Sequence, residues 1–118
     1  MSGALSYHAG AAAEDQVARH YEEAGFEIVA RRWRGRYGGE VDLIARHGPL
    51  LVFVEVKFSR SHEAAATHLM PRQLARIFRS AEEFMALGHI QAEDARFDLA
   101  LVDAQGRISI IENAAQSD

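Results

Sequence analysis

The sequence predicts an α/β fold whose elements follow the order helix, three strands, helix, two strands. Two segments with helical periodicity alternate with short segments rich in Val, Ile, Leu and Phe. The most apolar segment, 50–57, indicates a strand buried on both faces, as at the centre of a sheet. With 118 residues, of which 48% are hydrophobic, the chain is expected to form a single domain over 1–118.

Local signals set the expected element boundaries. An apolar stripe that includes Tyr21 predicts the first helix, and Gly25 is placed to end it. Pro71 suits the first turn of the second helix, and Gly88 is placed to end that helix. A loop is expected at 59–69 and a frayed tail from about 113 to 118. The predicted helices are 6–24 and 71–87, and the predicted strands are 26–30, 40–45, 50–57, 97–102 and 107–111.

Composition excludes several classes of function. The 17 acidic and 13 basic side chains give a net charge of −4, which excludes a uniformly basic nucleic-acid-binding protein but not a local basic face. The absence of cysteine excludes disulfides, thiolate zinc sites and a cysteine nucleophile. No apolar run approaches the roughly 20 residues that span a bilayer. The N-terminal segment has no Lys or Arg before Arg19 and no continuous apolar core, so we do not expect it to act as a secretory signal. We expect a cytoplasmic protein without membrane contact. None of the six histidines has zinc-ligand spacing.

Two charged pairs interrupt the apolar strands. Glu40-x-Asp42 and Glu55-x-Lys57 each place two side chains on one strand face. If the strands form an antiparallel hairpin with Asp42 facing Glu55, then Glu40 faces Lys57 and 47–50 forms the loop. A slip of two residues would also keep the charges together. The proposed register gathers an apolar set on the other face, namely Val41, Leu43, Ala45, Val52, Val54 and Val56.

Three carboxylates and one ammonium would thus meet on a largely buried sheet. Like charges in such a place raise one another's pKa values or require a cation. Oxygen ligands of this type suit Mg²⁺ or Mn²⁺. A buried salt-bridge cluster with a purely structural role is the alternative.

The motif residues also resemble a known family. The runs 39–45 and 52–57, with their GE-x-D and ExK patterns, resemble the YraN-like family of small bacterial proteins. That family is similar to archaeal Holliday-junction resolvases, and both belong to the restriction-endonuclease-like superfamily with its PD-(D/E)xK signature. The resemblance covers nearly the whole chain and implies an αβββαβ core with a mixed sheet flanked by helices.

The resemblance implies a role for each motif residue. Asp42 and Glu55 would be metal ligands, and Lys57 would be the catalytic lysine. Glu40 would be an accessory carboxylate of the catalytic site. Glu14 matches an early helix glutamate that reaches the metal site in related resolvases.

Substrate contacts follow the family pattern less closely. Gln73 and Arg76 fall where related nucleases carry polar groups from the second helix. Val41 stands where the superfamily signature has proline. After Lys57 the family usually has Thr or Ser and then Arg, whereas here Phe58 and Ser59 precede Arg60, so the basic group is displaced by one position.

A cluster of arginines precedes the charged pairs. Arginine is suited to bidentate phosphate contacts, and Trp33 could stack on an exposed base. The alternative is a solvated strand end with Trp33 half-buried. We favour phosphate contact because the cluster lies next to the proposed site in the sequence. The cluster consists of Arg31, Arg32, Arg34 and Arg36.

These observations predict a metal-dependent endonuclease that acts on DNA, in a branched or otherwise structured form. Water would attack the phosphodiester with the help of a metal ion on Asp42 and Glu55, while Lys57 stabilises developing charge or positions the water. The alternatives are a non-catalytic nucleic-acid-binding module on the same fold and a protein-interaction scaffold. A homodimer would suit a branched substrate.

Overall fold

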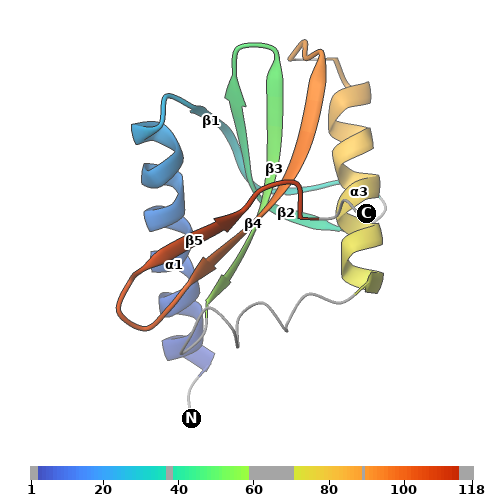
Figure 1. Cartoon of the computed structure of the whole chain (residues 1–118). Coiled ribbons are helices and arrows are strands. Elements are labelled where there is room, and N and C mark those ends of the chain that lie inside the picture. Colours follow the sequence, from blue (N-terminus) through green and yellow to red (C-terminus); the bar gives the residue numbers. More distant parts are fainter. Residues whose placement is uncertain (1–2, 37–38, 59–70, 89, 115–118) are drawn as a thin grey trace.

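One mixed five-stranded sheet lies between two helices (Figure 1). The computed structural model describes residues 3–36, 39–58, 71–88 and 90–114, with side chains from residue 10 onward and, in the second helix, from residue 74 onward. No helix in these ranges is long and apolar enough to span a bilayer. The elements are α1 (Gly3–Glu23), β1 (Glu27–Arg34), β2 (Glu40–His47), β3 (Leu50–Phe58), α3 (Pro71–Ala86), β4 (Asp94–Val102) and β5 (Ile108–Ile111).

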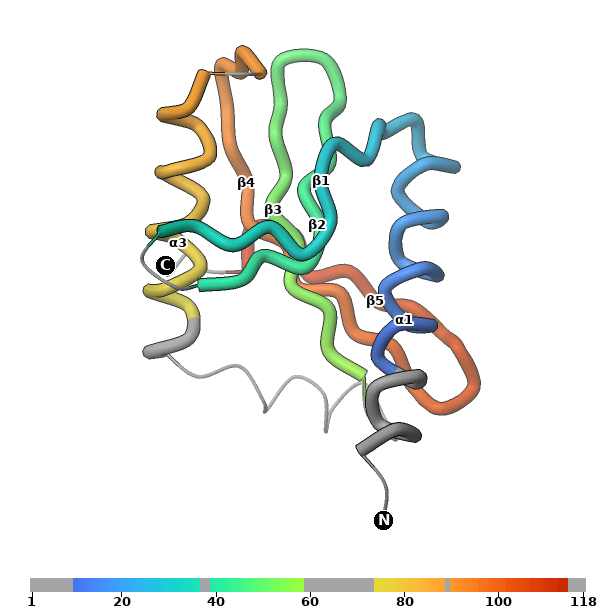
Figure 2. The backbone as a smooth tube through the Cα atoms, turned by 180° about the vertical axis from the view of Figure 1, so that it is seen from behind, coloured from blue at the N-terminus to red at the C-terminus, as the bar shows by residue number. Residues whose placement is uncertain are grey.

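The strands lie in the sheet in chain order, so β3 is central as the sequence predicts. β3 and β4 are parallel, and all other neighbouring strands are antiparallel. Parallel neighbours need a crossover connection, and α3 lies in that connection. Figure 2 shows β1 running from the end of α1 across the sheet toward α3. The predicted mixed sheet and the predicted element order are both confirmed.

Each face of the sheet is covered by one helix. The α1 face contains Val17 and Tyr21 of the helix, packed on Leu43, Val52 and Val54 of the sheet. The α3 face contains Ile77 and Ala81 of the helix, packed on a second set of sheet residues that includes Val41, Ile44, Leu51, Phe53 and Phe97. The strand order and these two cores explain the nearly continuous apolarity of β3.

One apolar residue lies on the face opposite to the predicted one. Val41 was expected beside Leu43 and Ala45, yet it packs in the α3 core. The alternation of faces holds while β2 is paired with β3, and that pairing runs from His47 only as far as Leu43. Beyond Leu43, β2 is paired with β1 and no longer with β3, and its path follows β1. Val41 therefore faces α3.

The helix ends follow the predicted glycine signals. Gly25 has a φ of 96°, and the N–H groups of Gly25 and Phe26 donate to the carbonyls of Glu22 and Tyr21. This pattern is a Schellman motif, which requires a left-handed residue at the position of Gly25. Gly88 has a φ of 72° just after α3, and its N–H donates to the carbonyl of Met85. Several elements are longer than predicted, most of all β1, which extends to Arg34 because it pairs with β2.

The C-terminal segment is attached to the sheet further than predicted. Asn113 and Ala114 were expected in the frayed tail, but the N–H of Asn113 donates to Asp98 and that of Ala114 donates to the carbonyl of Phe97. Asp98 is fully buried and also accepts a hydrogen bond from Tyr21 of α1. Residues 115–118 and the predicted loop at 59–69 lie outside the described residues.

Candidate functional site

The β2–β3 hairpin has the register that the charged pairs predict. Paired positions run from His47 opposite Leu50 to Leu43 opposite Val54, which is the register that brings Asp42 to Glu55. The turn contains only Gly48 and Pro49, because His47 and Leu50, which were expected in the loop, are paired with each other.

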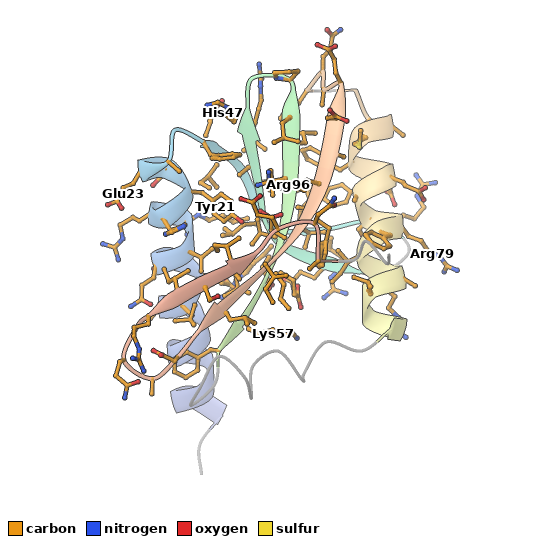
Figure 3. The ribbon with its side chains drawn as sticks, in the orientation of Figure 1. Tyr21, Glu23, His47, Lys57, Arg79 and Arg96 are labelled. Atoms are coloured by element: carbon orange, nitrogen blue, oxygen red, sulfur yellow. The ribbon has the colours of Figure 1, made fainter. Side chains whose placement is uncertain are left out.

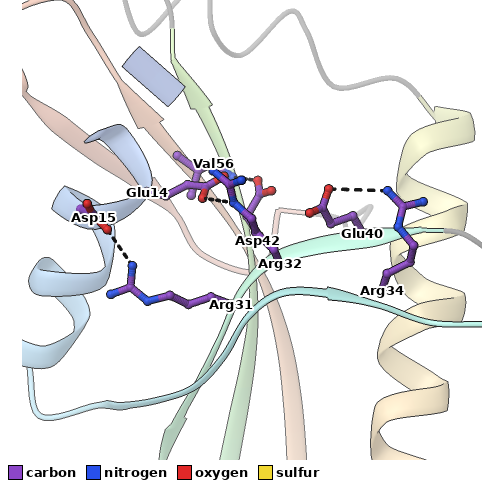
Figure 4. Close-up of polar contacts among 8 residues, drawn as sticks. All are labelled: Glu14, Asp15, Arg31, Arg32, Arg34, Glu40, Asp42 and Val56. Carbon is purple, nitrogen blue, oxygen red and sulfur yellow. Dashed lines mark hydrogen bonds and ion pairs between the residues drawn. The ribbon is translucent and has the colours of Figure 1, made fainter. Parts of the chain in front are cut away.

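At the other end the hairpin opens where the acidic residues begin. The backbone N–H of Val56 donates to Oδ2 of Asp42 at 2.7 Å (Figure 4). A side-chain carboxylate thus takes the place of the next ladder hydrogen bond. Two strands that separate in this way leave room for their polar side chains between them.

This opening overturns the predicted pairing of Glu40 with Lys57. Glu40 is opposite Arg34 of β1, and its Oε1 lies 3.7 Å from Nη2 of that arginine. Nζ of Lys57 lies 3.2 Å from Oε2 of Glu55 on the same strand. The prediction extended a two-stranded register past the point at which β2 leaves β3.

Asp42 and Glu55 form an acidic pair in which Glu55 is buried and Asp42 is half-buried. Burial and the adjacent charge of Glu55 raise the pKa of Asp42 to about 8, and Glu40 adds to the rise. The N–H of Val56 opposes the rise but does not cancel it. Contact with the Glu55 carboxyl therefore favours the protonated form of Asp42. Glu55 is only 4% exposed, so water solvates its charge poorly.

Lys57 differs chemically from every other cation in the protein. It is the only lysine among the 13 basic side chains, all others being arginine. A lysine ammonium is a compact charge with three donors, whereas arginine presents a flat, extended fork. The only lysine of the sequence therefore stands beside the acidic pair.

Glu14 lies beside the site on α1, but its carboxylate is bound by an arginine. Its Oε1 accepts a hydrogen bond from Nε of Arg32 at 3.0 Å. Burial raises the pKa of Glu14, and the charges of Asp42 and Glu40 raise it further, while Arg32 lowers it. Arg32 has a φ of 50°, an uncommon conformation for a residue other than glycine. The distortion lies in β1 at the level of Asp42.

The other predicted arginines are distributed along β1 and toward α3. Arg31 forms an ion pair with Asp15 of α1 at 2.7 Å, as Figure 4 shows. Arg36 is exposed, and its backbone N–H donates to Glu83. Arg76 is exposed on α3. Arg60 and the side chain of Gln73 lie outside the described residues.

Trp33 does not act as an exposed stacking platform. It is partly buried in the α3 core, and its ring meets that of Phe84 edge to face at 5.3 Å. The structure therefore supports the alternative for this residue, a half-buried tryptophan, although its arginine neighbours remain at the surface.

Gly39 holds the start of β2 against α3 and so positions the acidic residues. A Cβ at this position would lie 2.3 Å from the carbonyl oxygen of Arg76, which no side chain can tolerate. Ser80 of α3 donates a hydrogen bond to the carbonyl of Gly39. Only glycine allows this close approach to α3. The contact therefore fixes the position of the start of β2, the strand that carries Glu40 and Asp42.

The donor set fits a divalent cation that takes few protein ligands. Among the described residues no group of three or more acidic or histidine side chains is close enough to enclose a metal ion. The adjacent carboxyl groups of Asp42 and Glu55 nevertheless repel each other when both are charged, and a bound cation would offset that repulsion. Mg²⁺ commonly binds one or two carboxylates and completes its shell with water and substrate phosphates.

Comparison with known proteins places the chain in a family. The model of the uncharacterised protein family UPF0102 matches residues 13–102. The chain belongs to the UPF0102 family. A UPF0102 protein of Cereibacter sphaeroides is 56% identical over 117 residues, covering 97% of both chains. One from Ruegeria pomeroyi is 51% identical over 113 residues, covering 95% of this chain and 91% of the relative. One from Roseobacter denitrificans is 50% identical over 114 residues, covering 96% and 88%.

The UPF0102 match agrees with the predicted YraN-like family. The matched region begins just before Glu14 and ends with β4, so it includes every predicted site residue. The matched region thus contains the second half of α1, the open hairpin, α3 and β4.

Proposed function

We propose that this UPF0102 protein is a metal-dependent endonuclease that hydrolyses phosphodiester bonds in DNA, in a branched or otherwise structured form. The observation that carries the proposal is the convergence of Asp42, Glu55 and Lys57 where β2 and β3 separate. The resemblance of the two motifs to PD-(D/E)xK nucleases supports the same chemistry, as does the order of helices and strands.

Each residue has a chemical task in this proposal. Asp42 and Glu55 would hold Mg²⁺ or Mn²⁺. Such an ion, when bound, supplies Lewis-acid polarisation of a phosphoryl oxygen and a more acidic water. Lys57 donates hydrogen bonds to phosphoryl oxygens as their charge develops, or holds the attacking water. Glu40, at the rim of the same site, acts as an accessory acceptor for water.

Phosphate contacts would come from the arginines around the acidic pair. Arg31, Arg32 and Arg34 have acidic partners in the free protein, so DNA binding would exchange those carboxylates for phosphates. The exposed Arg36 and Arg76 extend the basic surface toward α3. Binding is therefore expected to weaken steeply with salt.

Metal-dependent thermal unfolding is the first test because it needs no substrate. A ligand that binds the folded state raises the melting temperature by mass action. Millimolar Mn²⁺ or Mg²⁺ is expected to stabilise the wild type and not Asp42→Asn. Asp94→Asn, at the exposed start of β4, is the matched acidic control and keeps the stabilisation. If the wild type shows no shift, alone or with DNA present, the metal site is refuted.

Cleavage assays then separate binding from catalysis. Branched, single-stranded and duplex DNA are incubated with each variant and either metal. Asp42→Asn and Lys57→Ala are each expected to lower the rate by a factor on the order of 10²–10⁴. Lys57→Ala keeps the metal-dependent thermal shift, because it removes no metal ligand. A Lys57→Ala variant that cuts normally would contradict the assigned role.

A non-catalytic role is the second candidate, and one observation favours it. The arginines of β1 and the lysine of β3 are ion-paired within the chain, as in a structural charge network. A nucleic-acid-binding module would bind DNA in a salt-dependent way without cutting it. A protein-interaction scaffold would bind neither metal nor DNA in the same assays.

A further inference from the structure

Exposed apolar side chains are concentrated on α3. Five large hydrophobic side chains are exposed among the described residues, and Phe78, Met85 and Leu87 lie on α3 or directly after it. Their exposed fractions are 39%, 37% and 50%. Phe78 and Met85 are seven residues apart, which is about two helical turns, so they share one face of the helix.

Phe78 and Met85 also border a groove between α3 and β4. The groove has a volume of about 370 Å³, and Phe53 and Phe97 contribute to its lining. The rings of Phe78 and Phe97 meet edge to face with centroids 5.7 Å apart. An exposed apolar surface of this kind marks an interaction site more often than an ordinary solvated face.

The charges on α3 indicate what covers this surface. Arg76 and Arg79 are exposed in its earlier turns, and Glu82 is exposed in a later turn. Arg79 extends outward from α3, away from the sheet (Figure 3). Within the described part of the chain, Arg79 and Glu82 form no ion pair, whereas each arginine of β1 is paired with an acidic side chain. The exposed face of α3 therefore changes from basic to acidic along the helix, between Arg79 and Glu82.

We propose that this face of α3 is a homodimer interface in which α3 packs antiparallel against α3 of a second copy. A two-fold axis reverses the helix direction, so the basic part of one copy faces the acidic part of the other. An axis near Ala81 places Arg79 close to Glu82 and Phe78 beside Met85 across the interface. A parallel arrangement would instead bring like charges together.

The size of the surface sets the expected strength. α3 has 16 residues and is therefore about 24 Å long. Stable interfaces usually bury about 1,200–2,000 Å² in total, and one helix with its neighbouring groove falls near the lower limit. The dimer is thus expected to dissociate in the micromolar range.

Sedimentation equilibrium tests the interface without any assumption about function. At protein concentrations well above micromolar, the wild type is expected to have about twice the monomer mass, and Phe78→Glu is expected to weaken association by at least about tenfold. Phe58→Glu is the matched control, because Phe58 is 41% exposed at the end of β3 and lies off the interface. Circular dichroism melting verifies that each variant is folded.

A charge exchange tests the antiparallel arrangement itself. Arg79→Glu and Glu82→Arg each place like charges against one another in a dimer of identical copies, so each variant alone should associate on the order of tenfold more weakly. An equimolar mixture of the two variants restores opposite charges at both contacts and should associate like the wild type. A monomeric wild type, a dimer insensitive to Phe78→Glu, or a mixture no stronger than its components would overturn the proposal.

Discussion

Two aspartates on strands of the same sheet, Asp98 buried and Asp42 half-buried, have opposite surroundings. Asp98 of β4 accepts hydrogen bonds from the hydroxyl of Tyr21 at 2.7 Å, from two nitrogens of Arg96 at 2.8 and 2.9 Å, and from the N–H of Asn113 at 3.2 Å. Asp42 of β2 accepts one from the N–H of Val56 and otherwise faces carboxyl groups. Figure 3 shows Tyr21 and Arg96 near the middle of the sheet.

The difference separates a carboxylate held by hydrogen-bond donors from a carboxyl group crowded by other acids. The Asp98 carboxylate is compensated by a guanidinium and neutral donors, so it links α1, β4 and the C-terminal segment at little cost. The half-buried Asp42 carboxyl is next to another acid, and both partial burial and that neighbour disfavour its charged form. Such an arrangement lowers stability unless a cation binds, and groups with pKa values perturbed in this way are enriched at functional sites.

The largest expected effect comes from breaking the compensated cluster. Asp98→Ala leaves Arg96 and the Tyr21 hydroxyl without their acceptor in a buried place, so the free energy of unfolding should fall by about 3–5 kcal/mol. Urea denaturation followed by circular dichroism measures the loss. The control Asp94→Ala, at an exposed position of the same strand, should change the value by no more than about 0.5 kcal/mol. A comparable loss in both variants would argue against the special role of Asp98.

Replacing Asp42 should change the stability in the opposite direction. Asp42→Asn removes a group whose pKa is raised to about 8 in the folded protein, so the variant should be more stable than the wild type near pH 8 without divalent metal. The folded state then binds more protons than the unfolded state between about pH 4 and pH 8, so wild-type stability falls as pH rises through that range. Below about pH 4 the two proteins should differ little.

Thermal melts across pH 3–9 in the presence of a chelator provide the measurement, and the melting temperature of the variant should exceed that of the wild type by several degrees at the alkaline end. Asp94→Asn again serves as the control, and it should follow the wild-type curve. A stability difference that does not grow with pH would show that Asp42 is not strained by its acidic neighbours.

The smallest effect should come from loosening the compensated cluster without breaking it. Tyr21→Phe removes one hydrogen bond to Asp98 but leaves the contacts with Arg96 intact. The expected loss is about 1–2 kcal/mol, less than half that of Asp98→Ala. Equal losses in the same denaturation assay would mean that the hydroxyl, and not the ion pair, supports the cluster.

The local sequence pattern was sufficient to predict much of the fold and the proximity of Asp42 to Glu55. The β2–β3 register could be predicted because the two strands are joined by a short turn, so a single alternation pattern restricts both. The central place of β3 followed from its apolarity, and Gly25 marked the end of α1. The pairing failed only past Leu43, where β1 rather than β3 determines the path of β2.

The amino-acid sequence by itself determined the order of the elements, the hairpin register and the meeting of Asp42 with Glu55 and Lys57. These features depend on residues close in sequence, for which periodicity and turn length leave few alternatives. Only the tertiary structure decided that Arg32 binds Glu14, that Trp33 packs on Phe84, and that Tyr21 reaches Asp98, 77 positions away. Such contacts depend on how α1 and α3 pack on the two faces of the sheet. A side chain can contact only the groups that this packing brings within its reach, and those groups can be far away in the sequence.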